Sequence, residues 1–424
     1  MRSDYGLLLA VVMSVCLVAE ARGQAIPDSI GQLDEDKILN GLEVREGYEV
    51  TPAVSDLHGI RFLEFGDRGE LYASMPRAGQ VMTLEDEDGD GLFEKRAVYV
   101  TNRDSPGLHG MDFHAGWLWY TTSTSVWKSR DTDGDGVADD NINVLEGLPG
   151  GSGHWWRPIL VTDTHFFTGV GDQGNVSDQT DTDRQKLFRY KLDGSDKTMW
   201  SSGIRNTEKL RMRPGTSEVW GCDHGSDNFG KEVGESFPND IPITDHYPPD
   251  ELNRYDEGEF YGHPFLVGKR VPRLEFLEHP KLLELASETR IPFWEFPAHS
   301  ATNGFTFIEQ SDAFPEDHAG DMLVACHGSW NRSYPSGYNI VRVLFDDTTG
   351  LPYGMLTIVE AKDAQGRGAY MRPVDCAQAP DGSVVFSFDH NVPGAPPGAF
   401  RLRWVGEDDT AAEDADDAIE EAGE

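Results

Sequence analysis

Two short acidic segments have the residue types and the spacing of calcium-binding loops. Their carboxylates are Asp86, Asp88, Asp90 and Glu94 in the first segment, and Asp131, Asp133, Asp135 and Asp139 in the second. Carboxylates at alternate positions converge on one point when a glycine permits a sharp turn, and Ca²⁺ prefers six to eight oxygen ligands. The pattern predicts a structural Ca²⁺ site in each segment. An acidic hairpin turn without metal is the alternative.

A second set of residues could do chemistry on a bound small molecule. Histidines, arginines and acidic residues border apolar stretches at His58, His109, His154, Arg157, Asp172, Arg205, Asn206, 223–227, 250–253, 261–264, 327–332 and Arg372. Several arginines suit a ligand with more than one carboxylate, because the planar guanidinium pairs with carboxylates in a fixed geometry. A histidine close to an aspartate suits a general base, although each histidine alone could also be a packed, hydrogen-bonded residue. We expect these side chains to converge at one mouth of the fold.

The elements that must position these residues form a repeat. Six similar segments occur in order: GELYASM from residue 69, GWLWYTT from 116, THFFTGVG from 164, SEVWGCDHG from 217, GDMLVACHG from 320 and GSVVFSFDH from 382. The first three steps, of 47, 48 and 53 residues, are close to the roughly 40–50 residues of a four-stranded propeller blade. The sequence therefore predicts an all-β fold, a six-bladed β-propeller. A two-sheet β-sandwich is the alternative, but it would not explain the spacing.

A longer step of 103 residues separates the fourth and fifth segments and indicates an insertion at about residues 231–292. We expect a long insertion in the fourth-to-fifth blade region, with a short helix in LLELASETR from residue 282. This insertion could be a surface loop, a cover over the mouth or an additional metal site.

Composition and the two ends of the chain exclude several classes of protein. The chain has 424 residues, with 36 Lys and Arg against 74 Asp and Glu and a net charge of −38, so we expect no nucleic-acid partner. Residues 1–25 are typical of a secretory signal peptide, and no later stretch is long and apolar enough for a membrane span. We expect a periplasmic or secreted protein. Its propeller would occupy residues 26–405, and its acidic residues 406–424 would form a disordered tail.

The motifs GHWWRP, TGVGDQGN, SGIRN, VWGCDHGSD, DELN, YGHP, ACHGSWNRSYPSGY and MRPVD, in this order, resemble the soluble glucose/sorbosone dehydrogenase family. The versions HGSWNR and DELN…YGHP are most similar to its sorbosone/pyranose dehydrogenase branch. The resemblance covers about residues 57–404. It implies a six-bladed propeller that binds pyrroloquinoline quinone (PQQ) and Ca²⁺.

The resemblance also implies roles for single residues. His154 corresponds to the catalytic base, Asp172 to the carboxylate that orients it, and Arg205 to the cation that stabilises developing negative charge. The residues expected to bind the cofactor are Arg205, Asn206, Arg332 and Arg372, together with Arg157 near the base. The carbonyls of Gly225 and Ser226 would hold a catalytic Ca²⁺, with Tyr261 close by. Trp155 and Trp156, which follow the base, could stack on a sugar or quinone or could narrow the pocket.

The function expected from these residues is a PQQ- and Ca²⁺-dependent dehydrogenase that oxidises an aldose or a sorbosone-like sugar. His154 would take a proton from a sugar hydroxyl while hydride passes to the quinone. The chain has no C-x-x-C-H haem motif, so electrons would pass to an external acceptor. Two alternatives are a calcium-dependent propeller lactonase or hydrolase and a non-catalytic sugar-binding propeller.

Overall fold

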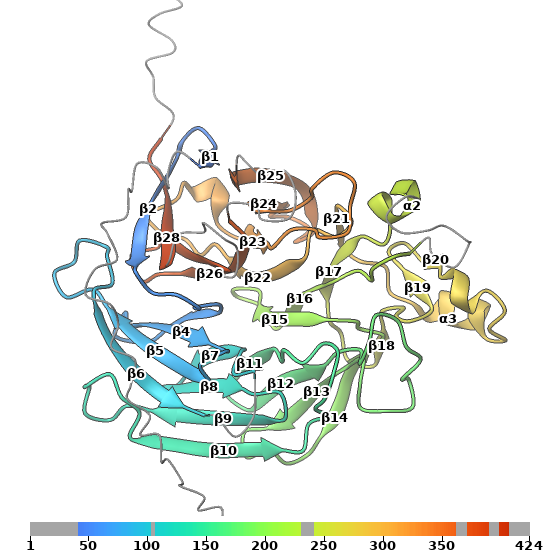
Figure 1. Cartoon of the computed structure of the whole chain (residues 1–424), viewed down its shortest axis with the longest axis horizontal. Helices are drawn as coiled ribbons and strands as arrows, with labels where there is room; N and C mark the ends of the chain where they lie inside the picture. Colours follow the sequence, from blue (N-terminus) through green and yellow to red (C-terminus); the bar gives the residue numbers. More distant parts are fainter. Residues whose placement is uncertain (1–40, 103–106, 230–240, 362–370, 390–397, 407–424) are drawn as a thin grey trace, which may run out of the picture.

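A computed structural model describes residues 41–102, 107–229, 241–361, 371–389 and 398–406. Six blades, each built on four antiparallel strands, are arranged around a central axis, as the sequence repeat predicts (Figure 1). The expected signal segment and, apart from Gly406, the expected acidic tail lie outside the described residues. No helix in the described part is long and apolar enough to cross a bilayer.

The first three blades follow one another along the chain. Blade 1 consists of β3 (Leu63–Phe65), β4 (Leu71–Met75), β5 (Gln80–Glu85) and β6 (Lys95–Thr101). Blade 2 consists of β7 (Met111–His114), β8 (Trp117–Thr121), β9 (Ser125–Arg130) and β10 (Asp140–Glu146). Blade 3 consists of β11 (Ile159–Val161), β12 (His165–Val170), β13 (Lys186–Lys191) and β14 (Thr198–Ser202).

The remaining blades close the ring. Blade 4 consists of β15 (Thr207–Met212), β16 (Val219–Asp223), β17 (Asp250–Arg254) and β21 (Trp294–Phe296). Blade 5 consists of β22 (Thr302–Phe307), β23 (Met322–Cys326), β24 (Asn339–Phe345) and β25 (Pro352–Ala361), extended by β1 (Leu42–Val44). Blade 6 consists of β26 (Pro373–Gln378), β27 (Val384–Phe388), β28 (Gly398–Trp404) and β2 (Tyr48–Ser55). Because β2 pairs with β28, an N-terminal strand completes the last blade.

The inner strands β3, β7, β11, β15, β22 and β26 contact one another in this order and form a closed ring around the central channel. The six repeat segments of the sequence form the second strands β4, β8, β12, β16, β23 and β27. These strands are buried on both faces, because each blade packs between two neighbours, and this explains their nearly continuous apolar character. The hydrophobic core is accordingly divided into six clusters at the blade interfaces. In one of them Trp220 packs against Phe345, with ring centroids 5.4 Å apart.

The expected insertion forms part of blade 4 and does not follow it. It supplies β17, and directly after the insertion the chain forms β21, the outer strand. Between these strands and before them it adds α2 (Ile241–His246), β18 (Glu259–Phe260), the hairpin of β19 (Leu266–Val267) and β20 (Val271–Pro272), and α3 (Leu282–Glu288). The strand β18 pairs in parallel with β14 of blade 3, and α3 confirms the helix predicted there. These elements lie at the periphery of the propeller (Figure 1).

Candidate functional site

The polar segments singled out in the sequence gather on one face of the propeller. In an antiparallel pair, the start of one strand lies beside the end of the other. Segments that precede the inner strands therefore meet segments that follow the second strands. For example, the His109 backbone N–H donates to the Thr121 carbonyl at 3.0 Å. This arrangement brings the segments carrying His154, Asp172, Arg205, Asn206, Gly225, Ser226, Arg332 and Arg372 to the same face.

His154 precedes β11 and lies against the segment that follows β12. Its backbone N–H and its ring Nδ1 both donate to the backbone carbonyl of Asp172, at 3.0 Å each. Because Nδ1 carries the proton in this arrangement, Nε2 carries the lone pair. Burial and the nearby Arg205 lower the pKa of His154 to about 2, so the ring is neutral. The ring therefore has the protonation state of a general base.

The carboxylate of Asp172 does not orient His154 in this structure, which corrects the role expected for it. It accepts hydrogen bonds at 2.7 to 2.9 Å from four other donors: His263 Nε2, Gln185 Nε2, Gly174 N and Ser177 N. Burial alone would raise the pKa of Asp172, but the bond and charge of His263 and the two backbone N–H groups lower it well below its usual range. Since these donors occupy the carboxylate, the carbonyl of the same residue holds the base.

Arg205 and Asn206 precede β15 and are held by residues of two other loops. Asp223 accepts their backbone N–H groups at 2.9 and 2.6 Å. Arg205 as a residue is 6% exposed, and its guanidinium donates to the carbonyl and the side-chain oxygen of Asn175, at 2.9 and 3.0 Å. Burial lowers the pKa of Arg205, and Asp227 acts in the opposite direction. A buried guanidinium is therefore fixed close to the neutral ring of the candidate base.

Arg372 precedes β26, across the face from Arg205. Its Nε donates to the carbonyl of His327 at 3.0 Å, and its guanidinium lies 5.2 Å from the ring centroid of Tyr338. Arg61, which precedes β3, forms an ion pair of 2.8 Å with Asp389. Burial lowers the pKa of Arg372, and the neighbouring Arg61 acts in the same direction. Two guanidiniums thus lie near each other on this side of the face.

Two other arginines expected to bind a cofactor have different contacts. Arg157 is fully buried and donates to three backbone carbonyls, those of Ser123, Pro149 and His154, at 3.2, 2.7 and 2.7 Å. It therefore anchors the loop that carries the base. Arg332 donates to the carbonyl of Ala298 at 3.1 Å, and none of its hydrogen bonds in the described structure reaches the other predicted cofactor residues.

The expected ligands of a catalytic Ca²⁺ line a small cavity. Gly225, Ser226 and Tyr261 surround a space of about 20 Å³ together with Asp223 and Glu251. A cavity of this size holds one water-sized species. Burial raises the pKa of Asp223 to about 6 and that of Glu251 to about 8. A bound cation would favour the ionised form of both groups, so the donor set suits a metal ion.

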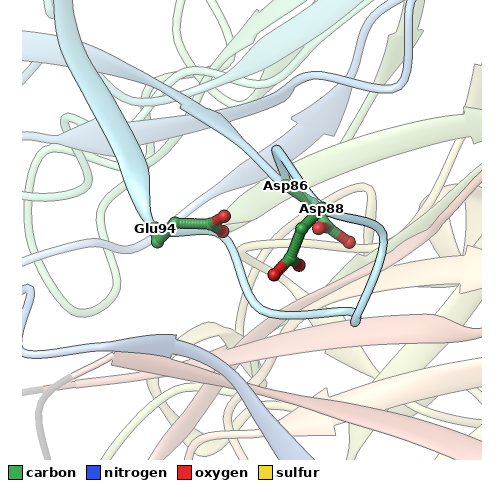
Figure 2. A group of neighbouring side chains, drawn as sticks. All are labelled: Asp86, Asp88 and Glu94. Atoms are coloured by element: carbon green, nitrogen blue, oxygen red, sulfur yellow. The ribbon is translucent and has the colours of Figure 1, made fainter.

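The two acidic loops lie on the opposite face, where they join β5 to β6 and β9 to β10. Carboxylate oxygens within 4.8 Å of one another belong to Asp86, Asp88 and Glu94 in the first loop, shown in Figure 2, and to Asp131, Asp133 and Asp139 in the second. Asp90 and Asp135 are not members of these groups; their carboxylates accept the backbone N–H two residues on, at 2.8 Å.

Each acidic loop also contacts the preceding blade. In the first loop, the Phe93 N–H donates to the carbonyl of Ala53 on β2 at 2.8 Å. In the second loop, the carbonyl of Gly136 accepts from the Thr83 hydroxyl on β5 at 2.9 Å. The first loop thus bridges blades 1 and 6, where the N-terminal strand completes the ring, and the second bridges blades 2 and 1.

Trp155 and Trp156 stack on each other, with ring centroids 4.8 Å apart. Trp156 also stacks on the fully buried His109 at 4.3 Å. Protein rings therefore hold Trp156 in place close to His154 in the chain.

Several residues of this face were not singled out from the sequence, among them Arg61, Asn175, Glu208 and Asp389. Glu208 is the second residue of β15, an inner strand, and its Oε1 lies 3.3 Å from Asn206 Nδ2. A charged residue within a short strand that borders the channel is the signal that could have found it. Asn175 and Asp389 lie outside the strands but within the segments TGVGDQGN and GSVVFSFDH, so their place in a motif and in the repeat is the signal that could have found them.

Two family models match parts of the chain. A family model described as a domain of unknown function, DUF7133, matches residues 42–256, which is just over half of the chain. The chain belongs to the DUF7133 family. A second family model, described as TrAA12-like, matches residues 285–392. A protein of Borreliella burgdorferi described as uncharacterized is 30% identical over 189 residues, which are 44% of this chain and 45% of that protein. The match therefore spans less than half the length of this relative.

Solved structures similar to this DUF7133 member include proteins described as pyranose and aldose sugar dehydrogenases. The calcium structure of Trichoderma reesei Carbohydrate-Active Enzymes Family AA12 has a TM-score of 0.72 at 18% identity, covering 86% of this chain and 97% of that one. The holo pyranose dehydrogenase PQQ domain from Coprinopsis cinerea has a TM-score of 0.71 at 18% identity, with coverages of 85% and 97%. The PQQ-bound aldose sugar dehydrogenase from Streptomyces coelicolor has a TM-score of 0.56 at 14% identity, with coverages of 85% and 99%. These likenesses confirm the expected resemblance at the level of the fold.

Proposed function

We propose that this protein is a PQQ- and Ca²⁺-dependent sugar dehydrogenase of the periplasm or the extracellular space. Its substrate would be an aldose or a sorbosone-like sugar, and its electrons would pass to an external acceptor. The observation that carries the proposal is a neutral His154 fixed beside the buried guanidinium of Arg205. Arg372 and Arg61 lie on the same face. The order of the sequence motifs and the fold of the structural neighbours support the same class of reaction.

The residues present fit both cofactors. Arg205, Asn206 and Arg372 would hold PQQ, because buried guanidiniums suit a planar ligand that carries several carboxylates. Gly225 and Ser226 would hold Ca²⁺ in the cavity whose carboxyl groups have raised pKa values. When bound, PQQ supplies a hydride-accepting quinone and Ca²⁺ supplies a Lewis acid.

In this proposal, Nε2 of His154 takes the proton from the sugar hydroxyl while the Asp172 carbonyl holds Nδ1. The positive charge of Arg205 stabilises negative charge that develops beside it. A pKa of about 2 is too low for an efficient base at neutral pH, because the best base has a pKa near the working pH. A bound polyanion would raise the pKa of His154, since negative charge favours the imidazolium form. Binding of the cofactor would therefore shift the pKa of the base toward the working pH.

Reconstitution tests the proposal. The purified protein would be incubated with PQQ and Ca²⁺, the quinone absorbance of the desalted protein recorded, and dye reduction followed with a panel of sugars. We expect retained quinone and sugar-dependent dye reduction, and His154→Ala should keep the quinone and lose turnover. Absence of both PQQ binding and turnover would contradict the proposal. Metal-dependent lactone cleavage without PQQ would indicate a hydrolase, and sugar binding without turnover would indicate a binding protein.

We also propose that the acidic loops bind Ca²⁺ with a structural role. Each loop brings three carboxylates together and joins two blades, on the face opposite the site. A cation there would stabilise the blade interfaces and the closure of the ring.

A further inference from the structure

Three side chains from three blades face one another where the central channel meets the site, and we call them the channel head: the buried Glu208 and His109, and the partly buried Arg61. Glu208 is 5% exposed and His109 is fully buried. Glu208 Oε2 lies 3.5 Å from His109 Nε2 and 3.8 Å from Arg61 Nη2. Oε2 and both ring nitrogens of His109 have no hydrogen-bond partner among the described residues. Unpaired buried polar atoms are costly, so such a group calls for an explanation.

Neighbouring side chains fix the positions of His109 and Arg61. The His109 ring lies against Phe62 and Trp156, with centroid distances of 4.0 and 4.3 Å. Arg61 is fixed by its ion pair with Asp389. The two groups that face Glu208 therefore have little freedom to move toward other partners.

The other carboxylate oxygen of Glu208 contacts the site. Oε1 accepts from Asn206 Nδ2 at 3.3 Å, and the same amide nitrogen donates to His224 Nδ1 at 3.0 Å. His224 Nε2 lies 2.9 Å from the carbonyl of Thr302, so Nε2 carries the proton and Nδ1 can only accept. Both hydrogens of the Asn206 amide are thus directed to acceptors. A flipped amide would bring its oxygen against the carboxylate and the imidazole lone pair, which is repulsive.

We propose that Glu208 is a positioning residue of the candidate site. Its carboxylate fixes the Asn206 side chain with the nitrogen turned inward, so that the amide oxygen is presented to a ligand. His109 and Arg61 lie beside the other oxygen of the carboxylate, at 3.5 and 3.8 Å, and limit the room in which it can turn. The proposal rests on the proposed function in that Asn206 is expected to contact PQQ, but the orientation of its amide does not depend on activity.

A double-mutant cycle on PQQ affinity is the first test. The variants are Asn206→Ala, Glu208→Ala and the double variant, each titrated with PQQ in Ca²⁺ and followed by quinone absorbance. We expect each single change to weaken PQQ binding by about tenfold, and the double variant to be within about twofold of Asn206→Ala, because Glu208 acts through Asn206. Glu208→Gln should recover most of the affinity, since its amide oxygen can still accept from Asn206. Equal effects of Glu208→Ala in the presence and absence of the Asn206 side chain would overturn the proposal.

A second readout is independent of cofactor and activity. The side-chain amide resonances of Asn206, assigned from their disappearance in Asn206→Asp, would be compared in wild type, Glu208→Ala and Glu208→Gln. We expect a shift and faster solvent exchange in Glu208→Ala and a smaller change in Glu208→Gln. The matched control is Glu64→Gln, because Glu64 borders the same channel but pairs with Arg211. Unchanged Asn206 resonances in Glu208→Ala would overturn the positioning role even in a protein that bound no PQQ. Absence of PQQ binding by the wild type would contradict the proposed function but not the positioning role of Glu208.

Discussion

Replacing Asp172 by asparagine tests the role of its side chain separately from the role of its backbone carbonyl. An asparagine keeps one oxygen, which can at best retain the three donors now at Oδ2, those of His263, Gln185 and Ser177. Each retained bond loses the contribution of the charge, about 1 kcal/mol, and the Gly174 N–H now bonded to Oδ1 is left facing an NH₂ group at a cost of about 1–3 kcal/mol. We expect the free energy of unfolding to fall by about 4–6 kcal/mol, a large part of the stability of a typical domain.

The activity of Asp172→Asn should change much less than its stability. The carbonyl that receives Nδ1 of His154 is still present, so the tautomer of the base is retained. At a temperature where the variant is folded, we expect a loss of PQQ-dependent dye reduction below about tenfold. His154→Ala should lose about 100-fold or more, the usual contribution of a general base. Urea denaturation gives the stability of both variants, and steady-state kinetics give the activity. A folded Asp172→Asn protein as inactive as His154→Ala would show that the carboxylate orients the base.

Three further predictions concern other parts of the molecule. The double variant Asp88→Asn/Asp133→Asn should lose most of the rise in Tm that Ca²⁺ produces over EDTA while keeping its PQQ affinity, because both loops lie away from the site; an unchanged response to Ca²⁺ would contradict their role as metal sites. Arg157→Met should lower the free energy of unfolding in urea by about 3–5 kcal/mol, since three carbonyls lose a buried donor, and a loss below about 1 kcal/mol would contradict an anchoring role. Burial raises the pKa of Asp112 to about 7, so this carboxyl stays protonated in the folded state at pH values where the unfolded state has lost its proton. Its contribution to stability is therefore present in acid and lost as the pH rises through 7. Asp112→Asn should gain stability relative to the wild type as the pH rises from about 4 to about 7 in urea titrations, with no further gain above that range, and a constant difference would refute this.

The propeller could be predicted from the sequence because its strongest signal is local. The second strand of each blade is buried on both faces, so GELYASM and its five counterparts are apolar almost throughout. The strand β17 could not be found in this way. Its sequence, DELNR, is mostly charged and polar, yet four of its five residues are buried. The buried carboxylates of Asp250 and Glu251 are satisfied by the backbone N–H groups of Gly225 and Gly268. The sequence around it therefore looked like a loop.

The candidate site was predictable in its members but not in its contacts. His154, Asp172 and Arg205 lie beside turns that the repeat places on one face, so their convergence follows from the topology. The partner of the Asp172 carboxylate, however, is His263, which is 91 residues away in the insertion. Because His263 occupies the carboxylate of Asp172, His154 donates to the backbone carbonyl of that residue. Glu208 was not predicted for a similar reason. Its neighbours Arg61 and His109 belong to blades 1 and 2, and closure of the ring brings them to Glu208 in blade 4.

The distribution of charge explains how so acidic a chain can carry a site for an anionic ligand. Ten of its 74 acidic residues lie in residues 407–424, and others form the two loops on the face opposite the site. Within the channel, charges are paired: Lys209 with Asp375 at 2.6 Å, and Arg211 with Glu64. At physiological ionic strength, interactions between exposed charges fade over about 8 Å, whereas buried charges are screened much less. Partly desolvated guanidiniums such as that of Arg205 therefore act on a ligand bound beside them more strongly than the distant exposed carboxylates that contribute to the net charge of −38.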